Sequence, residues 1–262
     1  MTGQIDIKNS EGASIKFEDM LDFAAQYNVV FFGEIHDDSI AHVMQMRVLE
    51  GLHARRQKVV LSMEMFETDT QIVLDEYLAG VISQKSFEKD ARVWSNYKDY
   101  SPMVDFQKSK KSKVVAANPP VRYVRMVTKD GQKVLGQLGK EAKKFLPPLP
   151  YYVASGRYAE KFDNIMGGHN TSMANIFESQ NLWDASMAFR INKAAKSDKD
   201  AVILHLCGGF HCEEKLGTVA QLNRYNSKLK ILVIVGTTKS TFDGLTDKQK
   251  RELADYVIIT KE

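Results

Sequence analysis

Two segments of the sequence share a glycine followed three residues later by a histidine. Gly33-Glu34-Ile35-His36 follows the apolar run 29–32, and Gly208-Gly209-Phe210-His211 follows the apolar run 201–206. A third apolar run, 59–63, ends at Glu64. Imidazole and carboxylate side chains together suit a divalent transition metal, which can activate water. The sequence therefore predicts a metal site formed by the residues that follow these runs, Glu34, His36, Glu64 and His211.

The same polar side chains also have a purely structural interpretation, because clusters of this kind can serve the fold alone. Glu34 would then cap the helix that follows it, and His36 and His211 would satisfy backbone carbonyls. His42 is expected near the same crevice as a hydrogen-bonded helix histidine, and His205 is expected in the core. Both interpretations stay open at this point.

A parallel sheet is the element that would bring these residues together. Near-continuous apolar, β-branched runs favour strands covered on both faces, and they occur at 29–32, 59–63, 114–116, 201–206, 231–235 and 257–259. Helical patterns lie between them, at 39–56, 70–78 and 190–195. This alternation predicts an α/β fold with a mainly parallel sheet flanked by helices. Ligands of such sheets bind outside the carboxyl ends of the strands, where the four polar residues are expected to meet.

The segment after residue 120 differs from the rest. Residues 121–161 hold nine Lys/Arg and three Asp/Glu, in a chain whose net charge is +3. We interpret residues 121–180 as a smaller, mostly helical insertion subdomain with an extended hinge at 147–150, beside a core formed by residues 1–120 and 181–262. A charge run of this kind is usually a solvated face.

A second interpretation of the insertion is a ligand pocket. Aromatic and sulfur side chains are interleaved with the basic residues, namely Tyr123, Tyr151, Tyr152, Tyr158, Met166 and His169. An apolar wall with cationic edges suits a flat, anionic, aromatic ligand such as haem, whose ferric iron a tyrosine or histidine can hold. Single-stranded nucleic acid also matches basic-plus-aromatic character, but no recognisable nucleic-acid module surrounds the segment.

Composition limits the protein class. With 262 residues, 44% hydrophobic and 26% charged, the chain has globular composition and holds one large domain, or one domain with a smaller appendage. A net charge of +3 does not indicate a nucleic-acid binder. No apolar run approaches the roughly 18–20 residues of a membrane-spanning helix. The first residues lack a leader pattern. If this is the native start, we expect a cytoplasmic protein; the same pattern is expected if a leader has been removed.

The pattern of residues as a whole resembles the ChaN-like haem-binding proteins. The resemblance covers roughly residues 29–222 and rests on Gly33-Glu34-Ile35-His36-Asp37, Gln45, Glu64-Met65-Phe66, Gln71, Leu74-Asp75-Glu76-Tyr77-Leu78-Ala79-Gly80, Trp94, Asp99-Tyr100-Ser101-Pro102, Ala116-Ala117-Asn118-Pro119, Gln180, Asp184, Met187-Ala188 and Gly208-Gly209-Phe210-His211. Residues 122–179 carry little that matches.

The resemblance implies a bacterial protein of haem or iron uptake, exported to the periplasm or anchored at the outer membrane as a lipoprotein. It implies a parallel sheet with a smaller helical domain, and haem (iron protoporphyrin IX) bound in a pocket linked to homodimerisation, through tyrosine, with histidine helping on the propionates. The family is also similar to Tiki-type metalloproteases and erythromycin esterases, whose Gly-x-x-His motifs and glutamates correspond to Glu34, His36, Glu64 and His211.

Three functions follow as hypotheses. The first is a haem-binding protein of haem uptake or trafficking, with haem, a second copy of the chain and uptake receptor or transporter components as partners. Its expected haem-binding residues are Tyr151, Tyr152, Tyr158, His169, His36 and His211. The second is a metal-dependent hydrolase in which a divalent metal is held by Glu34, His36, Glu64 and His211. The third is an inactive scaffold that only dimerises.

Overall fold

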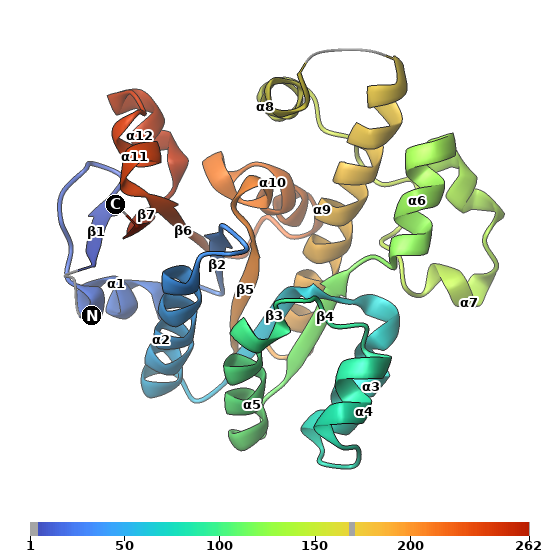
Figure 1. Cartoon of the computed structure of the whole chain (residues 1–262), viewed down its shortest axis with the longest axis horizontal. Helices are drawn as coiled ribbons and strands as arrows, with labels where there is room; N and C mark the ends of the chain where they lie inside the picture. Colours follow the sequence, from blue (N-terminus) through green and yellow to red (C-terminus); the bar gives the residue numbers. More distant parts are fainter. Residues whose placement is uncertain (1–4, 168–170, 262) are drawn as a thin grey trace.

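A seven-stranded sheet forms the centre of the computed structural model, which describes residues 5–167 and 171–261 (Figure 1). The strand order is β1-β7-β6-β2-β5-β3-β4. All neighbouring pairs are parallel except β1 and β7, which are antiparallel. The strands are β1 (Asp6–Asn9), β2 (Val29–Glu34), β3 (Val59–Glu67), β4 (Val114–Asn118), β5 (Val202–Gly208), β6 (Ile231–Thr238) and β7 (Tyr256–Lys261).

Helices cover both faces of this sheet, so the fold is mixed α/β, as the alternation of patterns predicts. The α-helices are α1 (Phe17–Ala24), α2 (Ser39–Arg55), α3 (Gln71–Leu78), α4 (Gln84–Asp90), α5 (Ser101–Ser109), α6 (Val121–Asp130), α7 (Lys140–Lys143), α8 (Arg157–Met166), α9 (Thr171–Ser197), α10 (Gly217–Tyr225), α11 (Lys239–Asp243) and α12 (Asp247–Leu253). Short 3-10 helices are η1 (Thr68–Thr70), η2 (Tyr97–Asp99), η3 (Gln132–Gln137), η4 (Gly209–His211) and η5 (Glu213–Lys215).

Alternate residues of each strand enter two different hydrophobic cores. In β2, Val30 and Phe32 pack with α1, α2 and α5 on one face, whereas Val29 and Phe31 pack with α9 and α10 on the other. Figure 1 shows the same division of the helices between the two sides of the sheet. Because both faces are covered, the strands are apolar along their whole length, which is why their positions could be read from the sequence.

The segment that we expect to be an insertion has a hydrophobic cluster of its own. Tyr123, Val127 and Tyr151 pack there against Leu182 of α9. Helix α9 is therefore shared, because its residues Met187 and Ile191 belong to the core on the sheet. The helix runs without interruption across residue 180, and Figure 1 shows α6 beside it at the edge of the molecule.

Two elements differ from the sequence expectations. Strand β1 was not expected; it is a four-residue antiparallel edge strand in which only Ile7 is buried, too short for a clear pattern. Helix α9 extends far beyond the expected stretch 190–195 and begins at Thr171. Its continuity across residue 180 was not predicted, because most buried side chains between residues 179 and 184 are polar, including Asn181 and Asp184, and the apolar period of a buried helix is weak there.

Candidate functional site

The carboxylate of Glu34, at the carboxyl end of β2, is buried within a ring of hydrogen-bond donors. Gln45 of α2 and the Tyr100 hydroxyl both donate to it, and His36 Nδ1 lies 2.9 Å from Oε1. His42 Nδ1 lies 3.4 Å from Oε2. Burial alone would raise the pKa of Glu34, but the hydrogen bonds from the two histidines and the tyrosine lower it below its ordinary value. Glu34 therefore stays an ionised, buried carboxylate.

Helix α2, which follows this strand, is capped by Asp38 and not by Glu34. The Asp38 side chain accepts hydrogen bonds from the backbone N–H groups of Ile40 at 2.9 Å and Ala41 at 3.2 Å. The expectation that Glu34 caps this helix was wrong, because its oxygens face the side chains of α2 and Tyr100 instead.

The imidazole of His36 is held through one ring nitrogen and is partly exposed. Its Nδ1 is bound to Glu34, its ring stands edge-on to Trp94 with 5.1 Å between ring centroids, and its side chain is 46% exposed. The backbone carbonyl of His36 accepts from Asn96 at 2.8 Å and from His42 Nε2 at 3.2 Å. The hydrogen bond to Glu34 raises the pKa of His36 above its ordinary value, against the effect of burial.

Gly208, at the end of β5, lets the four expected residues approach one another. A Cβ atom at this position would stand 2.9 Å from His36 Nε2 and 3.8 Å from His211 Cδ2. Its backbone N–H donates to Glu64 Oε2 at 2.8 Å, and His211 Nε2 lies 3.7 Å from Glu64 Oε1. The carboxyl-terminal parts of β2, β3 and β5 thus bring Glu34, His36, Glu64 and His211 to one place, as the strand-end rule predicts. Glu64 lies inside β3, which continues to Glu67, and does not follow the strand as expected.

His211 is held by a second network behind this point. Its Nδ1 lies 2.7 Å from Asp184 Oδ1, and Asp184 also accepts from the hydroxyls of Tyr158 at 2.5 Å and Thr218 at 2.9 Å. Gln180 Nε2 lies 3.3 Å from His211 Nδ1. Burial by itself would lower the pKa of His211, but the carboxylates of Glu64 and Asp184 raise it to about 9. His211 is therefore a buried cation between two carboxylates.

The tyrosines singled out in the sequence lie in different surroundings. Tyr158 is buried in the network of His211, and Tyr151 is buried in the cluster of the insertion, where its hydroxyl donates to the Glu178 carbonyl at 2.9 Å. Burial raises the pKa of both phenols. Tyr152 is 42% exposed, and the Arg224 guanidinium lies 3.7 Å from its ring centroid. His169, the remaining expected haem-binding residue, lies outside the described residues.

The sequence matches the family described as "Haem-binding uptake, Tiki superfamily, ChaN" over residues 20–222, which is most of the chain. The chain belongs to this family. The resemblance stated from the motifs is confirmed, and family membership supports haem as a ligand. No curated protein matches the chain in sequence.

Solved structures with the same fold include another ChaN protein. The structure described as "Cofacial heme binding to ChaN of Campylobacter jejuni" superimposes with a TM-score of 0.76 at 20% identity, covering 98% of this chain and 97% of that one. The type III effector HopBA1 gives a TM-score of 0.53 at 13% identity, with 93% and 92% covered. An erythromycin esterase, EreC, gives 0.53 at 11% identity, with 90% and 77% covered. At these identities the similarity shows the shared fold alone.

Several residues of the ChaN pattern prove to be partners of the expected site residues. Gln45 and Tyr100 donate to Glu34, Trp94 packs on His36, and Gln180 and Asp184 surround His211. Motif reasoning had not assigned them a role, because they lie on helices and loops far from the glycine-histidine segments in sequence. The only signal for them was their place in the family pattern.

A divalent metal finds no support in the described part of this chain. Within residues 5–167 and 171–261, no group of three or more His, Cys, Asp or Glu side chains is arranged to hold a metal ion. The carboxylate oxygens near the histidines are engaged instead: Glu34 by side-chain donors, Glu64 by the Gly208 N–H and Asp184 by two hydroxyls. In the same described residues, no helix is long and apolar enough to cross a membrane.

Proposed function

We propose that this protein binds haem at the carboxyl end of the sheet, with His36 donating a hydrogen bond to a haem propionate. The observation that carries the proposal is the environment of His36. Glu34, ionised and buried, holds Nδ1 and favours the protonated imidazole, while the side chain remains 46% exposed. A fixed, protonated and partly exposed imidazole is a suitable donor to a carboxylate.

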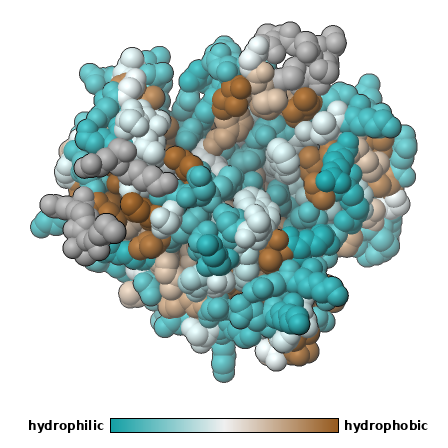
Figure 2. Space-filling view, in the orientation of Figure 1, coloured by the Kyte–Doolittle hydropathy of each residue, from teal (hydrophilic) through white to brown (hydrophobic). Residues whose placement is uncertain are grey.

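The surroundings of His36 fit the remainder of a haem. The side chains of Ile35, in the loop after β2, and of Ile40 and Val43, in the first two turns of α2, are apolar and exposed. Trp94 borders the imidazole ring. Farther along the same end of the molecule, Met166 of α8 is exposed, and Figure 2 shows hydrophobic side chains at the top of the view, where Figure 1 places α8. An apolar surface next to a cationic donor suits a flat ligand with carboxylates at its edge.

For the iron we propose Tyr152 as the ligand. Among Tyr151, Tyr152 and Tyr158, it is the one whose phenol is exposed. Tyr151 and Tyr158 would first have to break hydrogen bonds to the Glu178 carbonyl and to Asp184. Tyr152 lies against α10, where Gln221 donates to its carbonyl at 2.7 Å.

We also propose that two copies of the chain bind haem together. The cofacial haem of the Campylobacter jejuni ChaN supports this arrangement.

The proposed physiological role is haem or iron uptake or trafficking. The family's description as an uptake family supports it, and a periplasmic or outer-membrane lipoprotein with receptor or transporter partners would fit that role. Fractionation of cells that express the natural gene is the test of the compartment.

Hemin titration followed by the Soret band tests the binding site. We expect a saturable Soret shift for the wild-type protein and a weaker affinity for His36→Ala, because the donor to the propionate is lost. Tyr152→Phe should change the ferric spectrum, whereas the Tyr151→Phe/Tyr158→Phe double variant should keep it. His53→Gln is the matched control, since His53 bonds to Gln107 on α5, away from the strand ends. An unchanged hemin affinity in His36→Ala would refute the proposed site.

The pH dependence of binding separates a specific role of His36 from a structural one. Since Glu34 raises the pKa of His36, hemin affinity should fall as the pH rises through that value, and His36→Gln should remove this dependence. Sedimentation velocity with and without hemin tests the dimer: a monomer at saturating hemin contradicts the two-copy arrangement without affecting the His36 contact.

A further inference from the structure

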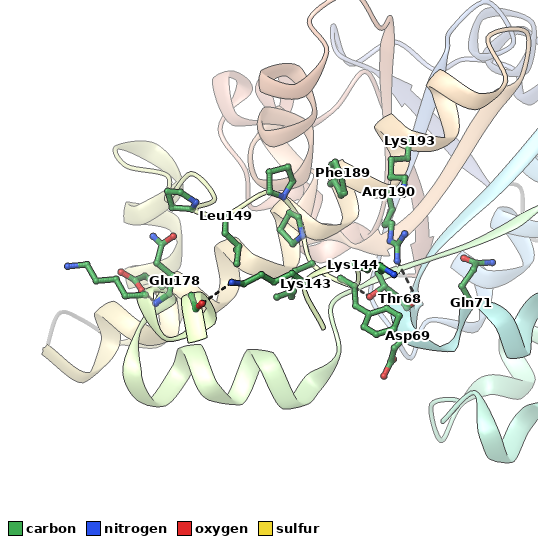
Figure 3. Close-up of a pocket in the computed structure, with 18 of the residues that line it drawn as sticks. Thr68, Asp69, Gln71, Lys143, Lys144, Leu149, Glu178, Phe189, Arg190 and Lys193 are labelled. Carbon is green, nitrogen blue, oxygen red and sulfur yellow. Dashed lines mark hydrogen bonds between the residues drawn. The ribbon is translucent and has the colours of Figure 1, made fainter. Parts of the chain in front are cut away.

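A large cavity lies along helix α9, apart from the cluster of His36 and His211. Its volume is about 1580 Å³, and its walls come from η1 and α3 of the core, from η3, α7 and residues 144–150 of the insertion, and from α9 (Figure 3). Ligand pockets commonly enclose about 300–1,000 Å³, so the cavity has room for a sizeable molecule. Neither His36 nor any tyrosine is among its lining residues.

One cation in this cavity lacks an anionic partner. Arg190 of α9 is half-buried, and its guanidinium makes one long hydrogen bond, 3.4 Å, to the Thr68 carbonyl. In the part of the chain that the structure describes, no carboxylate forms an ion pair with it, and burial lowers its pKa with no compensating charge. A desolvated guanidinium without a carboxylate is unfavourable, so an anion supplied from outside would stabilise it.

Two of the four acidic residues that line the cavity, Asp69 and Glu178, already have partners. Asp69 is paired with Arg92 and Arg122, which do not line the cavity. Glu178 accepts from the backbone N–H of Gln132. Lys193, one turn after Arg190 on the same face of α9, adds a second positive charge at that end. The anionic group of a ligand would therefore be drawn to Arg190.

The length and lining of the cavity define the remainder of the ligand. Glu178 and Arg190 both line it, and twelve residues of helix at 1.5 Å each separate them by about 18 Å. Figure 3 shows Leu149 near the Glu178 end and Phe189 near Arg190. The proline-rich residues 147–150 form a further apolar wall. Of the lysines that the insertion contributes, Lys143 donates to the Gly136 carbonyl and Lys144 is paired with Glu141. A single anionic head on Arg190, with an elongated apolar body, is therefore favoured.

We propose that this cavity is a second ligand site, distinct from the haem site, which binds a long-chain monocarboxylate with its head group on Arg190 and its apolar chain along α9.

Isothermal titration calorimetry with dodecanoate tests the site, with dodecanol as the uncharged probe of equal chain length. We expect saturable dodecanoate binding with one site per chain and much weaker binding of dodecanol. Arg190→Gln should weaken dodecanoate binding by about tenfold or more, as expected for a charge-assisted hydrogen bond. Lys196→Gln, an exposed lysine of α9 outside the cavity, is the matched control and should bind normally.

A melting curve of Arg190→Gln shows whether the variant is folded. If it is not, Lys193→Gln replaces it. This variant should lose less affinity for dodecanoate than Arg190→Gln and should keep its affinity for dodecanol. Three results would each overturn the proposal: no binding of dodecanoate, equally strong binding of dodecanol, or full affinity for dodecanoate in a folded Arg190→Gln variant. Displacement of dodecanoate by one equivalent of hemin would do so as well, because it would show that haem occupies the cavity.

Discussion

The buried cation His211 makes the stability of the fold depend on pH above neutrality. Its pKa is raised to about 9 in the folded protein, from 6.5 as an ordinary histidine, by Glu64 and Asp184 against the opposing effect of burial. A group with a raised pKa stabilises the native state fully below pH 6.5, and this contribution is lost as the pH rises through about 9. At about 1.4 kcal/mol per pH unit, the contribution is about 3 kcal/mol.

His42 adds to the same dependence. Its pKa is also raised to about 9, because its hydrogen bonds to Glu34 and Gln45 outweigh burial. The free energy of unfolding of the wild-type protein should therefore fall by several kcal/mol between pH 6.5 and pH 9.5. His211→Gln should remove about half of this fall, although the variant is less stable at pH 6.5 because Asp184 loses its charged partner.

Urea unfolding followed by tryptophan fluorescence at four values of pH between 6.5 and 9.5 measures this dependence. Trp94 and Trp183 report on the site directly, since they pack on His36 and His211. His53→Gln is the control. Because burial lowers the pKa of His53, replacing this residue should leave the pH dependence of the unfolding free energy above pH 7 unchanged. A slope in His211→Gln equal to that of the wild type would refute the charge assigned to His211.

Three further predictions follow from single contacts. Gly208→Ala should leave a folded protein but weaken hemin binding, measured by Soret titration, because the new Cβ would lie 2.9 Å from His36 Nε2 and displace the ring. Acidification below pH 6.5 should also lower the free energy of unfolding, because burial lowers the pKa of His205 to about 3 and the folded protein resists protonation of this residue. Urea unfolding between pH 4 and 6.5 should therefore depend less on pH in His205→Gln than in the wild type. Tyr151→Phe should lower the free energy of unfolding by about 1 kcal/mol, since one hydrogen bond to a carbonyl is lost, with unchanged hemin affinity.

The sheet was predictable because its strands are buried on both faces and therefore stand out as apolar runs. The edge strand β1 did not stand out, since it is short and half polar. The continuity of α9 across residue 180 was missed for a related reason: Asn181 and Asp184 are fully buried, yet polar, because they serve the network around His211 and the insertion. Apolar periodicity detects packing against a core, and it fails where a helix faces a polar site.

The meeting of Glu34, His36, Glu64 and His211 followed from the topology of parallel strands, which places strand ends at one edge of the sheet. The partners that hold these residues did not follow, because no local spacing connects Glu34 with Tyr100 or His211 with Asp184. The same limit applies to the tyrosines. A basic, proline-rich context says nothing about which phenol the fold buries.

A crystal structure of the hemin complex tests the proposed site most directly. It should show haem at the carboxyl ends of β2 and β5, with a propionate within hydrogen-bond distance of His36 Nε2 and the cavity along α9 free of haem. Haem seated in that cavity, or bound with no contact to His36, would contradict the assignment.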